Sequence, residues 1–369
     1  MGCKPSSADV SEPVRRPSNE LHELLEPLRV REHTPHVSRM PTSHASVKPT
    51  SKEPRKHRDV MSIFAEQGMI LDSVHSTPTS SSSALLSPSL MQQESDDMTR
   101  DTFSSDLKVT YGAASVTGQR NVNEDRHTAE TSVIHDKPIG FFGVFDGHGG
   151  SKVSEYLASN LHQTFFNHIK QRPSPSLDRQ LKEAMLVTDQ AIYDRSIEHG
   201  STAICVAIRE NEMAVASLGD SQAILSTYDG QVVDLCASHR PTQASETQRI
   251  LEAKGTVVNG RIFGVLGVSR AFGDNDFKTS KGAFKDKFNG DLVGGDPEVI
   301  HRPLTPNDDF IVLGCDGLFD VMTPEELAQY VRPRLALQSV QKTCEDVVHH
   351  ALRLGSTDNV STIIIKFHV

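Results

Sequence analysis

Short apolar segments recur along residues 107–369, and their spacing limits the possible fold more than any other feature. The strand-like segments come in succession, and so do the two longest stretches of helical periodicity. This grouping predicts an α+β domain built on antiparallel sheets, rather than a strict alternation of strand and helix. The expected strands are 107–116, 140–145, 202–209, 213–218, 222–227, 310–315 and 361–367. The expected helices are 151–170, 175–198, 244–254, 324–331 and 340–354.

Residues 1–106 have a different composition from the rest of the chain. They hold 10 of its 19 prolines and are rich in serine and threonine. Proline interrupts helices and strands, and the few apolar residues bury too little surface to offset chain entropy. We therefore predict a mostly disordered tail, 1–106, followed by one folded domain, 107–369. Two stretches of the tail, 19–28 and 59–74, have helical spacing; transient helices explain them more simply than a docking segment that folds on a partner.

Charge and cysteine content narrow the functional classes. The net charge of -10 argues against a broad electrostatic grip on nucleic acid. The sequence contains no run of 18 apolar residues that could span a membrane, and the N-terminus lacks the apolar core of a secretory signal. The five cysteines are scattered and form no CxxC pair, which suits a reducing compartment. We expect a cytoplasmic monomer that binds no nucleic acid.

Acidic residues stand beside several of the predicted strands. Asp146, Asp316 and Asp358 are examples, and the first two are each followed by glycine. A single Asp-Gly pair is usually a turn, and a lone histidine such as His148 is more often structural. Taken together, however, carboxylates at strand ends suit a hard divalent cation, which takes oxygen ligands. The sequence has no His/Cys cluster for zinc, no GxSxG string and no Walker-type phosphate loop.

Nine longer strings contain these residues. They are GQRNVNED (118–125), FFGVFDGHGG (141–150), GSTAICVAI (200–208), ASLGDSQAIL (216–225), SHRPTQASETQRILEAKG (238–255), RIFGVLGVSRAFGD (261–274), DPEV (296–299), CDGLFDVM (315–322) and GSTDNVSTIIIKF (355–367). In this order they resemble the motifs of the metal-dependent Ser/Thr protein phosphatases of type 2C. The resemblance implies two antiparallel β-sheets packed face to face, with helices on both outer faces. It also implies hydrolysis of phosphoserine and phosphothreonine on proteins, with Mg²⁺ or Mn²⁺ as cofactor.

The resemblance further implies a centre of two metal ions. Asp146 is expected to bridge the ions, which activate a shared water to the hydroxide that attacks phosphorus. Asp125 is expected to orient metal-bound water from outside the ligand set. The other expected ligands are Glu124, the carbonyl of Gly147, Asp316 and Asp358.

Three more roles follow from the same resemblance. Arg120 is expected to grip the phosphoryl oxygens, for which its planar guanidinium is suited. His148 is expected to protonate the leaving oxygen of the seryl or threonyl side chain. Asp220 and Asp320, together with Asp316, are expected to form a third, weaker metal site.

The chain departs from the family pattern at two places. Phe319 stands where the family commonly has Trp, and residues 238–241 read Ser-His-Arg-Pro where the family has Asp-His-Lys-Pro. Neither change removes an expected metal ligand, so a catalytically dead scaffold, which would have lost one, is disfavoured. A metallohydrolase of small phosphoesters would use the same site, and the residues alone leave that alternative open.

The first residues, MGCKPS, match the pattern for N-myristoylation of Gly2. Cys3 follows directly and is a candidate for palmitoylation. One acyl chain holds a protein to a membrane only marginally, whereas two hold it stably. We therefore expect peripheral attachment to a membrane through the lipidated N-terminus.

Overall fold

The structure, a computed structural model, describes residues 102–104, 107–279, 281 and 287–368. Almost all of the predicted tail, including Gly2, Cys3 and the two stretches of helical spacing, lies outside the described residues. Within the described part, no helix is both long and apolar enough to cross a membrane. The first described element, β1 (Thr102–Ser104), lies slightly before the expected boundary and pairs with the strand that follows it.

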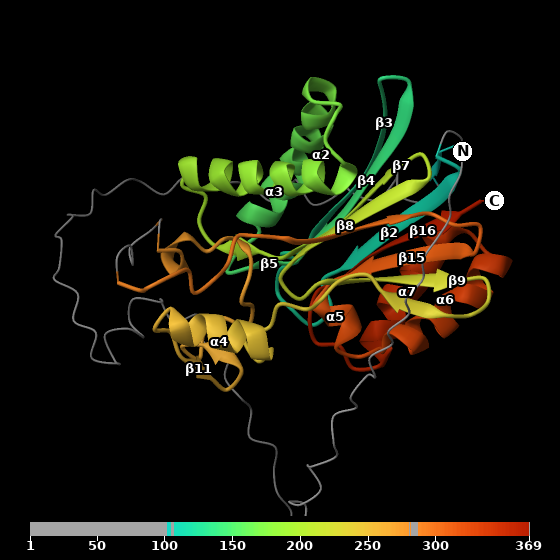
Figure 1. Cartoon of the computed structure of the whole chain (residues 1–369). Coiled ribbons are helices and arrows are strands. Elements are labelled where there is room, and N and C mark those ends of the chain that lie inside the picture. The colour runs from blue at the N-terminus through green and yellow to red at the C-terminus, as the bar shows by residue number, and fades with distance from the viewer. Residues whose placement is uncertain (1–101, 105–106, 280, 282–286, 369) are drawn as a thin grey trace, which may run out of the picture. The chain divides into compact units, whose positions relative to one another are not determined.

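Two antiparallel sheets form the centre of the domain (Figure 1). The first sheet has the strand order β1, β2 (Val109–Val116), β16 (Val360–Phe367), β15 (Asp308–Gly314), β9 (Gln222–Thr227) and β10 (Val232–Asp234). The second has the order β14 (Glu298–Pro303), β8 (Glu212–Leu218), β7 (Ala203–Arg209), β4 (Lys137–Phe145) and β3 (Arg126–Ile134). All seven predicted strands are present, each within a few residues of its expected bounds.

The two sheets pack face to face, and the alternation of side chains along each strand explains how. In β4, Phe142 and Val144 point toward the first sheet and join its Ile311 and Ile363 in one core cluster. Phe141, like Phe145, points to the opposite side and packs against helices. Both faces of β4 are therefore buried, which is why its sequence is continuously apolar instead of alternating.

Helices cover both outer faces. The second sheet is covered by α2 (Lys152–Gln171) and α3 (Leu177–Asp194), and the first by α5 (Asp316–Phe319), α6 (Pro324–Leu337) and α7 (Val340–Arg353). A further helix, α4 (Ala244–Glu252), lies beside a small hairpin of β11 (Val257–Val258) and β12 (Arg261–Ile262). The predicted sandwich of two sheets between helical layers is confirmed.

A small third sheet completes the description and bears on the site. It joins β13 (Phe272–Gly273), β6 (Gly200–Ser201) and β5 (Gly147–His148). A short 3-10 helix, η1 (Asn275–Phe277), follows β13. The strands of the third sheet are too short to leave an apolar run, so the sequence gives no sign of them.

Candidate active site

The predicted site residues gather where the chain crosses between the two large sheets. The connection from β2 to β3 carries Arg120, Glu124 and Asp125, and the turn from β8 to β9 carries Asp220. Register explains why these connections meet. Arg126, directly after Asp125, pairs with Phe145 of β4, so Asp125 and Asp146 emerge side by side. The hairpin of β3 and β4 thus places both carboxylates at one edge of the sandwich.

The first sheet contributes to the same edge from its other strands. Asp316 begins α5 just after the end of β15, and Asp358 stands just before β16. These two strands are neighbours, with Gly314 paired to Thr362. The structure therefore brings together the carboxylates expected to form the metal centre.

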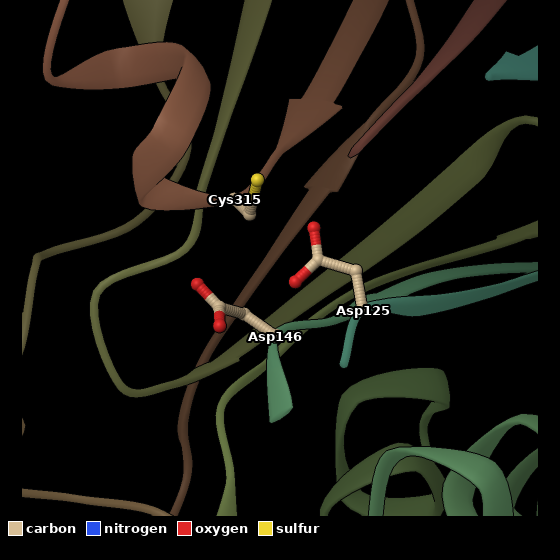
Figure 2. Close-up of side chains that lie close together, drawn as sticks. All are labelled: Asp125, Asp146 and Cys315. Atoms are coloured by element: carbon tan, nitrogen blue, oxygen red, sulfur yellow. The ribbon is translucent and has the colours of Figure 1, made fainter. Parts of the chain in front are cut away.

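Two carboxylates and a thiol lie at the middle of this edge. Figure 2 shows Asp125 and Asp146 extending from neighbouring strands toward Cys315; their ligand atoms all lie within 4.8 Å of one another. Burial raises the pKa of Asp125 to about 6, even though the Ser361 hydroxyl donates a hydrogen bond to it at 2.7 Å. Burial, together with the charges of Asp125 and Asp316, raises the pKa of Asp146 well above its usual range.

Asp316 is affected in the same way. Burial raises its pKa to about 7, and the charges of Asp220 and Asp358 add to the effect. Burial is the main cause of these raised pKa values and neighbouring carboxylates add to it, so the ionised form of each group is disfavoured. The donor set of carboxylate oxygens fits hard divalent cations, whose binding would relieve the repulsion.

Cys315 forms part of the wall of this site. Its thiol is fully buried, and burial with nearby carboxylates raises its pKa well above the usual value. It donates a hydrogen bond to the Asn359 carbonyl and accepts one from the Ser361 N–H. A neutral thiol is a poor partner for a hard cation, so Cys315 is a buried core residue beside the site rather than a metal ligand.

Gly147 must be glycine for a steric reason. A Cβ built there would lie 2.5 Å from the Glu124 carbonyl oxygen, which the Ser154 hydroxyl also approaches. The Glu124 N–H donates to the side-chain carbonyl of Asn359 at 2.9 Å. The Asn359 amide also donates to the carbonyl oxygens of Thr117 and Val122. One amide therefore holds the loop that carries Glu124.

Asn359 was not predicted as a site residue. Its position directly after Asp358 in the GSTDN string was the available signal, but its three partners in the loop lie more than 230 residues away in sequence. No local pattern indicates such a contact.

Arg120 lies at the exposed rim of the site. Its guanidinium donates to an Asp358 oxygen at 2.6 Å, and 57% of the side chain is exposed. The other oxygen of Asp358 accepts the backbone N–H of Asn359. The cation predicted to bind phosphate is thus anchored to a predicted metal ligand and open to solvent.

His148 has a partner that the sequence analysis missed. Its Nε2 lies 2.7 Å from the carboxylate of Asp274, a residue in the left-handed region at φ 46°. Gly200 leaves the necessary room, because a Cβ there would clash with both side chains. Burial alone would lower the pKa of His148, but the Asp274 carboxylate outweighs it and raises the pKa. The Gly-Asp end of the 261–274 string was the only available signal.

The carboxylates expected at a third metal site also meet, but an arginine lies among them. Arg240 Nε donates to Asp220 at 3.0 Å and its Nη2 to Asp320 at 2.7 Å. The same Nη2 lies 4.0 Å from Asp316. Arg240 is one of the departures from the family pattern, and no contact with these carboxylates was predicted for it.

The sequence was also compared with profiles of known protein families. The sequence profile described as Protein phosphatase 2C matches residues 109–360, well over half of the chain. The chain belongs to the protein phosphatase 2C family. The resemblance drawn from the nine strings is confirmed, and this phosphatase 2C is a metal-dependent protein serine/threonine phosphatase, a hydrolase.

Two curated relatives show the extent of the similarity. The phosphatase 2C is 33% identical over 285 residues to the integrin-linked kinase-associated serine/threonine phosphatase 2C of Bos taurus, over 68% of this chain and 74% of that protein. It is 34% identical over 284 residues to protein phosphatase 2C homolog 2 of Hypocrea jecorina, over 71% of this chain and 63% of that protein. Both alignments are consistent with a shared phosphatase domain.

Solved structures support the fold. A sex determining protein of C. elegans superposes with a TM-score of 0.62 at 32% identity, over 70% of this chain and 64% of that chain. The serine-threonine phosphatase 2C of Toxoplasma gondii superposes with a TM-score of 0.59 at 21% identity, over 70% of this chain and 95% of that chain. At that lower identity, the second likeness speaks for the fold alone.

Proposed function

We propose that this phosphatase 2C acts through a centre of two Mg²⁺ or Mn²⁺ ions at the edge of the sandwich. The observation that carries the proposal is the convergence of carboxylates at this edge, where the ligand atoms of Asp125 and Asp146 lie within 4.8 Å of one another and the charge of Asp316 also acts on Asp146. Asp146, on which the charges of Asp125, Asp316, Asp220 and Asp358 act, would hold both ions. The remaining ligands would be Glu124, the Gly147 carbonyl, Asp316 and Asp358.

When bound, such ions supply the Lewis acidity that activates water and neutralises charge on the phosphoryl group. The chain would orient the reactants. Asp125, fixed by the Ser361 hydroxyl, would accept a hydrogen bond from the attacking water. Arg120 uses one Nη donor on Asp358, which leaves its other N–H groups for the phosphoryl oxygens.

His148 would supply the proton for the leaving alkoxide. The Asp274 carboxylate engages Nε2, so Nδ1 is the atom from which a proton can pass to substrate. Neutralising a strongly basic leaving group in this way contributes about 10²–10⁴-fold to rate. The substrates would be phosphoserine and phosphothreonine side chains of proteins, acted on by the monomeric enzyme.

The activity assay compares a phosphothreonine peptide with free phosphoserine as a small phosphoester. We expect the full-length protein to hydrolyse the peptide with Mn²⁺ or Mg²⁺, to stop in EDTA, and to recover when the metal is restored. Full activity in EDTA would contradict the metal centre. Faster turnover of free phosphoserine than of the peptide would favour the metallohydrolase of small phosphoesters.

We also propose that the N-terminus attaches this cytoplasmic enzyme to a membrane. The MGCKPS pattern supports myristoylation of Gly2, and Cys3 offers a site for a second chain. Gly2 lies more than 100 residues before Arg120, so lipidation should set the enzyme's location and leave its chemistry unchanged.

Fractionation of cells that express three forms tests this attachment. Wild type should be found with membranes, Gly2→Ala should be in the soluble fraction, and Cys3→Ser should bind weakly because a single chain holds marginally. All three should hydrolyse a soluble phosphopeptide equally. A soluble wild type, or a membrane-bound Gly2→Ala, would show that the match to the pattern is accidental.

A further inference from the structure

Arg240 stands in the position that a third metal ion would need. Its guanidinium bonds Asp220 and Asp320 at the same time, through different nitrogens, and approaches Asp316. These are the three carboxylates that the sequence assigned to a third ion. The Asp220 side chain is only 6% exposed, so few other partners can reach its oxygens.

The chain holds this arginine in place through the residue before it. The backbone N–H of His239 donates to the Gly219 carbonyl at 2.8 Å, and the Gly219 N–H donates back to the His239 ring at 3.2 Å. Gly219 directly precedes Asp220. This reciprocal pair therefore fixes the start of the Arg240 side chain beside Asp220. On the other side, the Arg240 carbonyl accepts the N–H of Gln243, at the N-cap of α4.

The chemistry of arginine makes the arrangement incompatible with a resident third ion. A guanidinium stays protonated at any physiological pH, so it cannot yield its charge as a buried lysine can. A divalent ion on Asp220 and Asp320 would have to displace it from both carboxylates or lie a few ångströms from a fixed positive charge. Either outcome weakens ion binding, by at least about tenfold.

We propose that Arg240 supplies from the chain itself the positive charge that a third ion would bring, so that this centre holds two ions and excludes a third. The proposal rests on the two-ion centre proposed above. It differs from the third, weaker site expected from the sequence: the three carboxylates come together, but Arg240 bonds two of them, Asp220 and Asp320. Arg240 is a positioning residue, which holds Asp220 and Asp320 beside the ligand Asp316.

The test counts bound Mn²⁺ on the full-length protein, by the loss of the free-ion signal in electron paramagnetic resonance during a titration. Wild type should bind two ions and no more as Mn²⁺ is raised. Arg240→Gln should gain a third, weaker ion, because Asp220 and Asp320 are then left with no positive partner between them. The double variant Arg240→Gln/Asp320→Asn should lose that third ion again.

Arg332→Gln is the matched control. Arg332 forms an ion pair with Asp309 at 2.9 Å, and the side chains of this pair are about as exposed as those of Arg240 and Asp220. Asp309, however, lies at the start of β15, whereas Asp316 follows the other end of that strand. Arg332→Gln should bind two ions like wild type. Thermal melts in EDTA establish that each variant is folded before its ions are counted.

The outcomes separate the two proposals. A third ion in wild type that Asp320→Asn removes would overturn the role of Arg240 while leaving the two-ion centre standing. A third ion missing from Arg240→Gln, or gained equally by Arg332→Gln, would also overturn it. A wild-type protein that binds no Mn²⁺ would contradict the metal centre itself.

Discussion

Two groups of carboxylates in this phosphatase differ in where their countercharge comes from. Glu246, on α4, is almost fully buried between Arg249 at 2.9 Å and Arg270 at 2.7 Å. Burial would raise its pKa, but the two arginines outweigh burial and hold the pKa at about 2. At the edge of the sandwich, burial raises the pKa values of Asp146 and Asp316, and the charges of neighbouring carboxylates raise them further.

The difference separates a structural site from a reactive one. Where the chain supplies its own cations, the carboxylate is satisfied in the folded protein and stabilises it. Where buried carboxylates outnumber the cations that the chain places beside them, the folded protein carries repulsion that a bound cation can relieve, at a cost in stability. Asp220, with Arg240 beside it, lies between these two cases.

The largest expected effect comes from removing charge at the reactive site. Asp146→Asn should lower turnover of a phosphopeptide at least about 10³-fold, because it removes the carboxylate proposed to hold both ions. In EDTA, however, the same variant should melt at a higher temperature than wild type. Each kcal/mol of relieved repulsion is worth about 2–4 °C in a domain of this size. A lower melting temperature in EDTA would contradict the comparison.

Removing charge at the structural site should do the reverse. Glu246→Gln should reduce the free energy of unfolding by about 3 kcal/mol at pH 7, since it leaves two arginines without their partner. Turnover per folded molecule should persist. Urea unfolding of both forms, with the peptide assay alongside, measures the two effects, and an unchanged stability would refute the assignment.

The stability difference between wild type and Glu246→Gln should depend on pH. The pKa of Glu246 is about 2 in the folded protein against 4.5 ordinarily. A depressed carboxyl pKa contributes stability that is complete above about pH 4.5 and is lost as the pH falls toward 2. The stability difference between wild type and Glu246→Gln should therefore narrow over that interval. A difference that stays constant would point to packing instead of charge.

Within the reactive site, His148 has a countercharge from the chain itself, the carboxylate of Asp274. His148→Ala should slow peptide hydrolysis about 10²-fold or more, but slow an aryl phosphate much less, because an aryl leaving group needs no proton. Asp274→Asn and Gly200→Ala should show the same preference in weaker form, since both disturb the pair. Equal losses on both substrates would remove His148 from the role of acid.

The smallest effect should come from replacing the guanidinium group beside Glu246 with another positively charged group. Arg249→Lys retains a cation near Glu246 but loses the forked contacts to Glu246 and to the carbonyl oxygens of Ser269 and Asp291. We expect a loss of about 1 kcal/mol in unfolding free energy. A loss as large as that of Glu246→Gln would mean that geometry matters more than charge here.

The sequence predicted strands well where both faces are buried and poorly at the sheet edges. β3 and β14 were missed, and both are edge strands with polar or charged residues on one side. The helix expected at 324–331 runs on to Leu337 in spite of Pro333, because Val331 and Leu335 continue its buried face. The pattern of apolar residues reflects burial, so an element that is half exposed to solvent has only a weak pattern.

The candidate metal ligands could be proposed from the sequence because they lie in recognisable strings beside strands, and such neighbourhoods are local. The family and the sandwich followed from the same strings. Only the tertiary structure decided which cations those carboxylates meet. Arg240 reaches Asp320 across 80 positions and His148 reaches Asp274 across 126. Contacts at that separation are set by strand register and by which strands lie side by side, and no local pattern of residues records them.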